Sequence, residues 1–109
     1  MTNQRNVDLL SKQGFEFVIS TITKYELYAG ATQNQIGFWD SIMATISIIP
    51  FDENCVDKAI NINTALKRKR KQIDLADLFI AATAVAHHLA IATLNKKHFD
   101  RIDELIIIE

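Results

Sequence analysis

Residues Ile73 to Asn95 read IDLADLFIAATAVAHHLAIATLN, and this stretch decides the fold. From Asp74 to His88 the pattern is apolar almost all round, which predicts a helix buried on more than one side. The short apolar run from Leu89 to Leu94 predicts a buried strand. A buried helix that leads directly into a buried strand is typical of a sheet covered by helices. The two aspartates at the start of the helix, Asp74 and Asp77, need a separate explanation.

The rest of the chain alternates between strands and helices. Glycine and proline are scarce, so a few residues mark the element ends. The first predicted elements are the end of a helix over Asn6–Gln13 closed by Gly14, a strand over Phe15–Ser20 and a helix over Ser20–Gly30. A second helix within NQIGFWDSIMATISIIP is predicted to lead into an extended run at Ile46–Pro50. The later elements are a helix over Asp52–Lys71, a helical turn in NKKHFDRI and a final strand in ELIIIE.

This order predicts an α/β fold. Strands that are continuous apolar runs indicate a mostly parallel sheet with both faces covered. In such folds the helices begin at the edge where the strands end, and ligands bind along that edge. Glu26, Asp77 and Asn95 are all expected there.

Composition bounds the class of protein. The 109 residues suffice for one domain, residues 1–109, with a real core. The net charge of −1 means that any electrostatic partner must be bound by a local patch. Cys55 is the only cysteine, so an intrachain disulfide is excluded and a reducing cytoplasm is expected; the side chain itself is expected to be a small buried group. The N-terminus lacks the apolar core of a signal peptide, and no membrane span is expected.

The acidic residues allow two interpretations. Asp74 suits a helix N-cap, and Thr23 with Glu26 has the spacing of a capping box. Glu26 and Asp77, however, have apolar neighbours, and a half-buried carboxylate without a partner is costly. A divalent cation such as Mg²⁺ or Mn²⁺, which binds oxygen ligands, would compensate both.

Two segments resemble the motifs of a known family. ISTITKYELYAGA, residues 19–31, resembles the second motif of PIN domains, and IDLADLFIAATAVAHHLAIATLNKKHFDRI, residues 73–102, resembles the third and fourth. The likeness spans about residues 16–108 and is strongest to VapC-type toxins of bacterial toxin–antitoxin pairs. The combination of the aspartate before IAATA with the later TLNKKHF is specific.

The resemblance implies a three-layer α/β/α sandwich with a Mg²⁺- or Mn²⁺-dependent endoribonuclease site. It also implies a cytoplasmic homodimer that binds RNA as substrate and an antitoxin as partner. By position, Glu26, Asp77 and Asn95 would be the catalytic and metal-binding residues. Asn95 would use its carbonyl oxygen, and Asp100 is a weaker substitute.

The front of the chain departs from the family pattern, which begins with an apolar strand ending in an aspartate. Here Asp8 follows no strand. The domain is therefore expected to be N-terminally truncated, without its central strand and carboxylate, and its activity to be weakened or lost. The alternative is a catalytically inactive PIN-like remnant that acts as a protein-interaction module.

Three further features have both a structural and a functional interpretation. Lys67, Arg68, Lys69 and Arg70 suit a helix C-terminus or an RNA-binding patch. His87 and His88 are expected to be dipole partners at a helix end, with His98 nearer the site. The aromatic residues Tyr25, Tyr28, Phe38 and Trp39 suit core packing or a partner contact.

Overall fold

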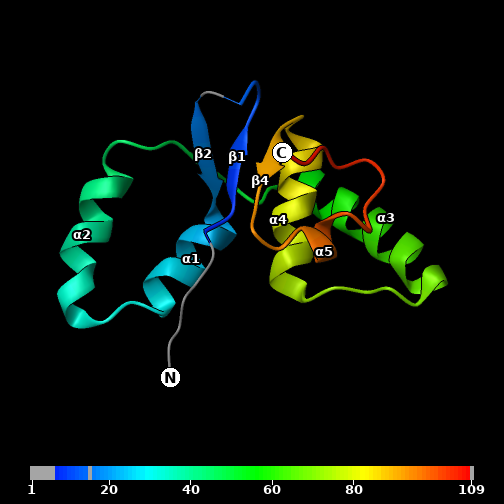
Figure 1. The fold of residues 1–109 in the computed structure, drawn as a ribbon, viewed down its shortest axis with the longest axis horizontal. Coiled ribbons are helices and arrows are strands. Elements are labelled where there is room, and N and C mark those ends of the chain that lie inside the picture. Colours follow the sequence, from blue (N-terminus) through cyan, green and yellow to red (C-terminus); the bar gives the residue numbers. More distant parts are fainter. Residues whose placement is uncertain (1–6, 15, 109) are drawn as a thin grey trace.

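The computed structural model describes residues 7–14 and 16–108 and contains a four-stranded sheet in the order β3-β2-β1-β4. The strands are β1 (Leu9–Ser11), β2 (Phe17–Ser20), β3 (Ile48–Ile49) and β4 (Ala90–Ala92). Helices flank the sheet on both sides, with α1 and α2 on one side and α3 and α4 on the other (Figure 1). The predicted α/β class with helices on both faces is confirmed.

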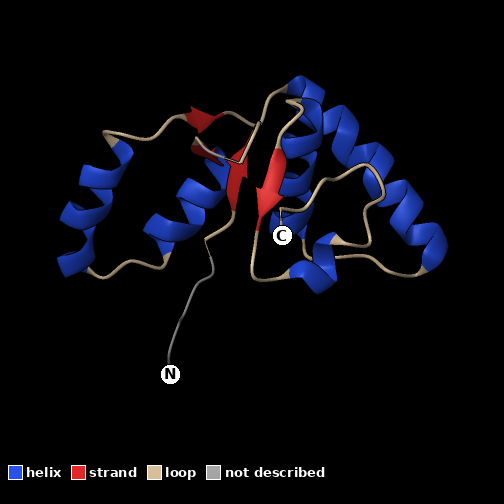
Figure 2. Cartoon of the chain, turned by 45° about the horizontal axis from the view of Figure 1, so that its top comes forward, coloured by secondary structure: helices blue, strands red, loops and turns tan. Residues whose placement is uncertain are grey.

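Three of the four strands run in the same direction. β2 pairs with β3 in parallel, with Ile19 opposite Ile48. β1 pairs antiparallel with both β2 and β4, and Leu10 lies opposite Val18 on one side and Ile91 on the other. The sheet is therefore mostly parallel, as predicted, with β1 reversed inside it (Figure 2).

The prediction of a helix end over residues 6–13 is wrong for the part that the structure describes. Residues 9–11 form β1, and Leu10 is fully buried. This segment is too short to be a stable helix. Pairing with β2 on one side and β4 on the other satisfies its backbone N–H and C=O groups instead. The Gly14 N–H donates to the Ser11 hydroxyl at 2.8 Å, and the φ of +83° at Gly14 closes the turn into β2.

The first two helices begin where the sequence predicts. α1 (Thr21–Ala29) follows β2 directly, is capped by the Ser20 hydroxyl and ends before Gly30. α2 (Gln33–Met43) begins with a capping box formed by Thr32 and Gln35.

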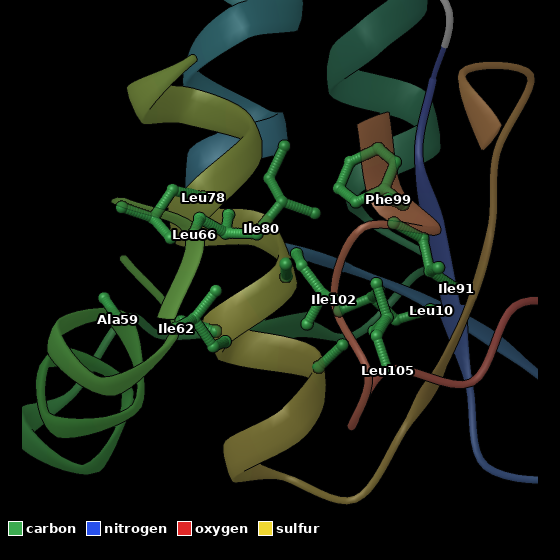
Figure 3. Close-up of a cluster of buried hydrophobic side chains, with 13 residues drawn as sticks. Leu10, Ala59, Ile62, Leu66, Leu78, Ile80, Ile91, Phe99, Ile102 and Leu105 are labelled. Carbon is green, nitrogen blue, oxygen red and sulfur yellow. The ribbon is translucent and has the colours of Figure 1, made fainter. Parts of the chain in front are cut away.

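Helices α3 (Glu53–Lys69) and α4 (Leu75–Ala86) supply much of the core. In α4, Ile80 and three alanines are fully buried, which confirms that this helix is covered on more than one side. Figure 3 shows Leu66 and Ile62 of α3 facing α4, with Leu10 and Ile91 of the sheet on the other side of α4. Among the described residues, no helix combines the length and apolarity needed to cross a membrane.

The C-terminal part is less regular than predicted. The helical turn is present as α5 (Lys96–Phe99). The final strand is reduced to a single parallel bridge between Ile91 and Ile107. Ile106 is largely exposed, so this segment lacks the continuous burial that a longer strand would need.

Candidate metal centre

The edge at which β2 and β4 end is also the edge at which α1 and α4 begin (Figure 1). Because β1 is reversed, its first residues lie at this same edge rather than at the opposite one. Asp8 immediately precedes β1. The chain therefore places a carboxylate beside the ends of the parallel strands, where the sequence predicted none.

Asp8 is only 6% exposed, and its carboxylate accepts a hydrogen bond of 2.7 Å from the Thr93 hydroxyl. Burial raises the pKa of the Asp8 carboxyl; the Thr93 hydrogen bond lowers it, and the negative charge of Asp77 raises it. Hydrogen bonds also connect the two aspartates: the Thr93 hydroxyl bonds to Asp8 and to the Asn95 backbone, and the Asn95 amide bonds to Asp77. Asp8 thus adds a carboxylate to this region. The expected loss of the family's first strand and its terminal aspartate stays a prediction, because Asp8 precedes the reversed strand β1.

Asp77 and Asn95 are brought together as predicted. Asp77 is half-buried in the first turn of α4, and the Asn95 side-chain amide donates to its Oδ2 at 3.4 Å. The Nδ1 atom of His98 lies 3.2 Å from the same oxygen and 2.8 Å from the Asn95 amide nitrogen. His98 thus belongs to the centre, closer than the sequence indicated.

Thr93 connects the two halves of the centre. Its hydroxyl donates to Asp8 and accepts a hydrogen bond of 2.9 Å from the Asn95 backbone N–H. Sequence reasoning missed both Asp8 and Thr93. The signal for Asp8 was a hairpin pattern, in which two short apolar runs flank a turn closed by Gly14.

Glu26 lies half-buried in the second turn of α1. The capping-box interpretation is excluded, because Ser20 is the N-cap and Thr23 occupies the third helical position. Helix α1 contacts α4. The assignment of Glu26 to the metal centre remains a prediction.

The remaining acidic residues of this region are peripheral. Asp74 occupies the N-cap position of α4, as predicted, but is exposed, and its side chain makes no capping hydrogen bond. Asp100 is exposed at the end of α5.

The basic run closes α3 and leads into α4. Lys67, Arg68 and Lys69 form the last turn of α3, and Arg70 ends it in the left-handed region with a φ of 56°. All are exposed, and Lys69 forms an ion pair of 3.5 Å with Asp103. The connection from this run reaches the start of α4, at the edge that carries Asp77 (Figure 1).

The sequence matches the PIN domain family over residues 3–105, and the chain belongs to this family. It is 33% identical to ribonuclease VapC2 of Rickettsia felis, over 94% of this chain and 79% of that protein. It is 34% identical to ribonuclease VapC1 of Methanocaldococcus jannaschii, over 79% of this chain but only 64% of the relative. The crystal structure of VapBC2 from Rickettsia felis bound to a promoter DNA fragment matches with a TM-score of 0.79 and 30% identity, covering 84% of this chain and 72% of that one.

Ribonucleases of this family are metal-dependent, and the donor set of this chain fits a divalent cation. Asp8 and Asp77 offer carboxylate oxygens, and Asn95 an amide. Among the ion pairs between described residues, none joins either aspartate to a lysine or arginine. Two neighbouring carboxylates without such a cation are costly to keep ionised, which a bound metal ion would reverse.

Proposed function

We propose that this chain is a VapC-type endoribonuclease that hydrolyses RNA phosphodiesters with Mg²⁺ or Mn²⁺. The observation that carries the proposal is the buried Asp8 carboxylate beside Asp77 and Asn95. The ribonuclease names of the relatives support the reaction class. Weakened or lost activity remains the alternative expectation, and the Asp8 carboxylate at this edge supports the active form.

Each residue has a distinct part in the proposed site. Asp8, Asp77 and Glu26 would bind the ion, and Asn95 would orient it or its water through the amide carbonyl. The ion would lower the pKa of a water and polarise the phosphodiester. Thr93 fixes the Asp8 carboxylate through its hydroxyl. The Nδ1 atom of His98 either donates to Asp77 Oδ2 or accepts from the Asn95 amide, depending on the tautomer.

The site should prefer Mg²⁺ or Mn²⁺ over softer metal ions, because carboxylate and amide oxygens are hard donors that suit both of these ions. The imidazole of His98 beside Asp77 favours Mn²⁺, because nitrogen ligands bind this ion more readily than Mg²⁺. A cytoplasmic setting agrees with an RNA substrate and with a single free cysteine.

The proposal is tested with purified chain and a labelled RNA. Cleavage should require Mn²⁺ or Mg²⁺, stop with EDTA and be lost in Asp77→Ala. Asp74→Ala is the matched control, because this exposed aspartate lies three residues away and makes no capping hydrogen bond. If the folded wild-type chain cleaves nothing with either ion, the chain is instead a non-catalytic interaction module of the same fold.

The proposal includes an antitoxin partner, since the related crystal structure contains VapBC2. It also includes a second copy of this chain, as the family resemblance implies. Helices α1 and α2 expose Tyr25 and Phe38, and α2 has no buried residue among those described. Phe38→Glu should therefore weaken antitoxin binding in a pull-down and change the melting temperature by less than about 4 °C, since surface changes cost at most about 0.5 kcal/mol. Undiminished binding would exclude this surface.

A further inference from the structure

Three potential metal ligands converge where α3 begins and α4 ends. Asp52 is the N-cap of α3, Cys55 lies in its first turn, and His87 is the C-cap of α4. A carboxylate oxygen, the sulfur and an imidazole nitrogen all lie within 4.8 Å of one another. This cluster is separate from the PIN metal centre, because about ten helical residues, or roughly 15 Å, separate His87 from Asp77.

Ordinary structural roles account for only part of this cluster. The Asp52 Oδ1 atom accepts from the Cys55 N–H at 3.1 Å, which caps α3. The Cys55 thiol is buried and donates to the Pro50 carbonyl at 3.7 Å. The Nε2 atom of His87 is buried and makes no hydrogen bond to any described residue, although it lies 3.4 Å from the second Asp52 oxygen. A buried nitrogen without a hydrogen bond is unfavourable and faces directly into the other two donors.

The chemistry of the three donors fits zinc, and so does the separation of the nitrogen and oxygen donors. Bonds of about 2.1 Å in a tetrahedral site put a nitrogen and an oxygen ligand about 3.4 Å apart. The observed separation of His87 Nε2 and Asp52 Oδ2 is also 3.4 Å. Thiolate with imidazole selects Zn²⁺ or Co²⁺ over the hard ions Mg²⁺ and Mn²⁺. The Asp52 and His87 side chains are 40% and 31% exposed, so an ion can enter from solvent while Cys55 forms the floor.

We propose that Asp52, Cys55 and His87 bind a zinc ion, with water at the fourth position, and that the ion joins the start of α3 to the end of α4. On binding, the thiol proton passes to solvent, and a zinc–sulfur bond replaces the hydrogen bond to Pro50. The two helices already pack against each other along the core. The ion therefore adds a cross-link at the end of the helix pair that lies away from Asp77. This inference is independent of ribonuclease activity.

The direct probe is Co²⁺, which gives a near-ultraviolet sulfur-to-cobalt absorption band when it binds a thiolate. The reduced, metal-free chain should develop this band with one Co²⁺ per chain, and Zn²⁺ should displace it. His87→Gln and Asp52→Asn should each weaken Co²⁺ binding by more than about tenfold, since even indirect ligand contacts contribute that much. Asp52→Asn retains an N-cap oxygen, so the start of α3 should persist.

His88→Gln is the matched control, because this adjacent histidine is exposed and outside the cluster. It should bind Co²⁺ as the wild type does. Zn²⁺ should raise the melting temperature of the wild type and of His88→Gln but not that of His87→Gln, because only an ion bound to the folded state stabilises it. Circular dichroism verifies that each variant is folded. The proposal is overturned if the wild type shows no band, or if folded His87→Gln binds Co²⁺ with unchanged affinity.

Discussion

The Asp8 side chain is buried, and burial disfavours the charged form of its carboxyl group. The pKa of its carboxyl is raised above the ordinary value of 3.8, so the folded state holds the proton more tightly than the unfolded state. Below that ordinary value both states are protonated and the effect is absent. As the pH rises through the raised folded pKa, the folded state loses stability, and above it the loss is complete. At neutral pH the metal-free site is therefore destabilising.

Asp8→Asn should raise the melting temperature of the metal-free chain at pH 7. The amide carries no charge, and its oxygen can still accept the hydrogen bond from Thr93. The advantage should shrink as the pH falls toward about 4, where the aspartate is itself protonated. Thermal scans in EDTA across this range measure the difference. Saturating Mn²⁺ should then stabilise the wild type more than the variant.

Asp100→Asn serves as the control for this comparison, since it removes a carboxylate that is exposed at the end of α5. Its melting temperature should follow that of the wild type at every pH. An Asp8→Asn variant that melts below the wild type at pH 7 would contradict the assigned cost of the buried charge.

Asn95→Asp should tighten Mn²⁺ binding and lower the melting temperature of the metal-free chain. The Asn95 amide nitrogen lies 3.4 Å from Asp77 Oδ2, so the new carboxylate adds negative charge beside an existing one. One more charge near a divalent ion is worth on the order of a tenfold gain in affinity in a partly solvated site. Calorimetric titration with Mn²⁺ measures the gain. Equal affinity in the two proteins would place the ion away from residue 95.

At the scale of elements, the sequence was informative wherever the signals were local. The helix α4 followed from its apolar pattern, and the ends of α1 followed from Ser20 and Gly30. The α4 pattern and the apolar run that follows it also indicated where Asp77 and Asn95 lie. Strand β1 was missed because it depends on partners distant in sequence, and its Asp8 meets Thr93 across 85 residues. A three-residue strand carries too little pattern of its own to indicate such pairing.

Leu10→Ala tests whether β1 is a central strand. Leu10 is fully buried between β2 and β4, so its truncation should cost about 2–5 kcal/mol of unfolding free energy. Leu94→Ala, at a position that is 83% exposed, should cost less than about 0.5 kcal/mol. Urea denaturation of both variants provides the comparison. Similar small costs for the two would show that residues 9–11 do not lie in the sheet.

At the scale of the whole molecule, acidic and basic groups gather at one edge although the net charge is only −1. The carboxylates of Asp8 and Asp77 lie at the edge where β4 ends. The exposed basic run of residues 67–71 ends α3 and leads into α4 at that same edge (Figure 1). An RNA backbone bound by this run would have phosphates directed toward the metal centre, since phosphate contacts position a nucleic acid without reading its sequence.

Replacing Lys67 and Arg68 by glutamine should weaken RNA binding and flatten its dependence on salt. Both side chains are exposed, and neither takes part in an ion pair between described residues, whereas Lys69 is bound to Asp103. Each lost phosphate contact to single-stranded RNA should reduce the slope of log affinity against log salt by about 0.7. Filter binding in EDTA measures affinity without cleavage.

Lys12→Gln is the control, because Lys12 is exposed in the turn between β1 and β2 at the opposite edge of the sheet. A slope that falls equally in the control would mean that RNA responds to net charge alone, and an unchanged slope in the double variant would remove the basic run from the RNA-binding surface.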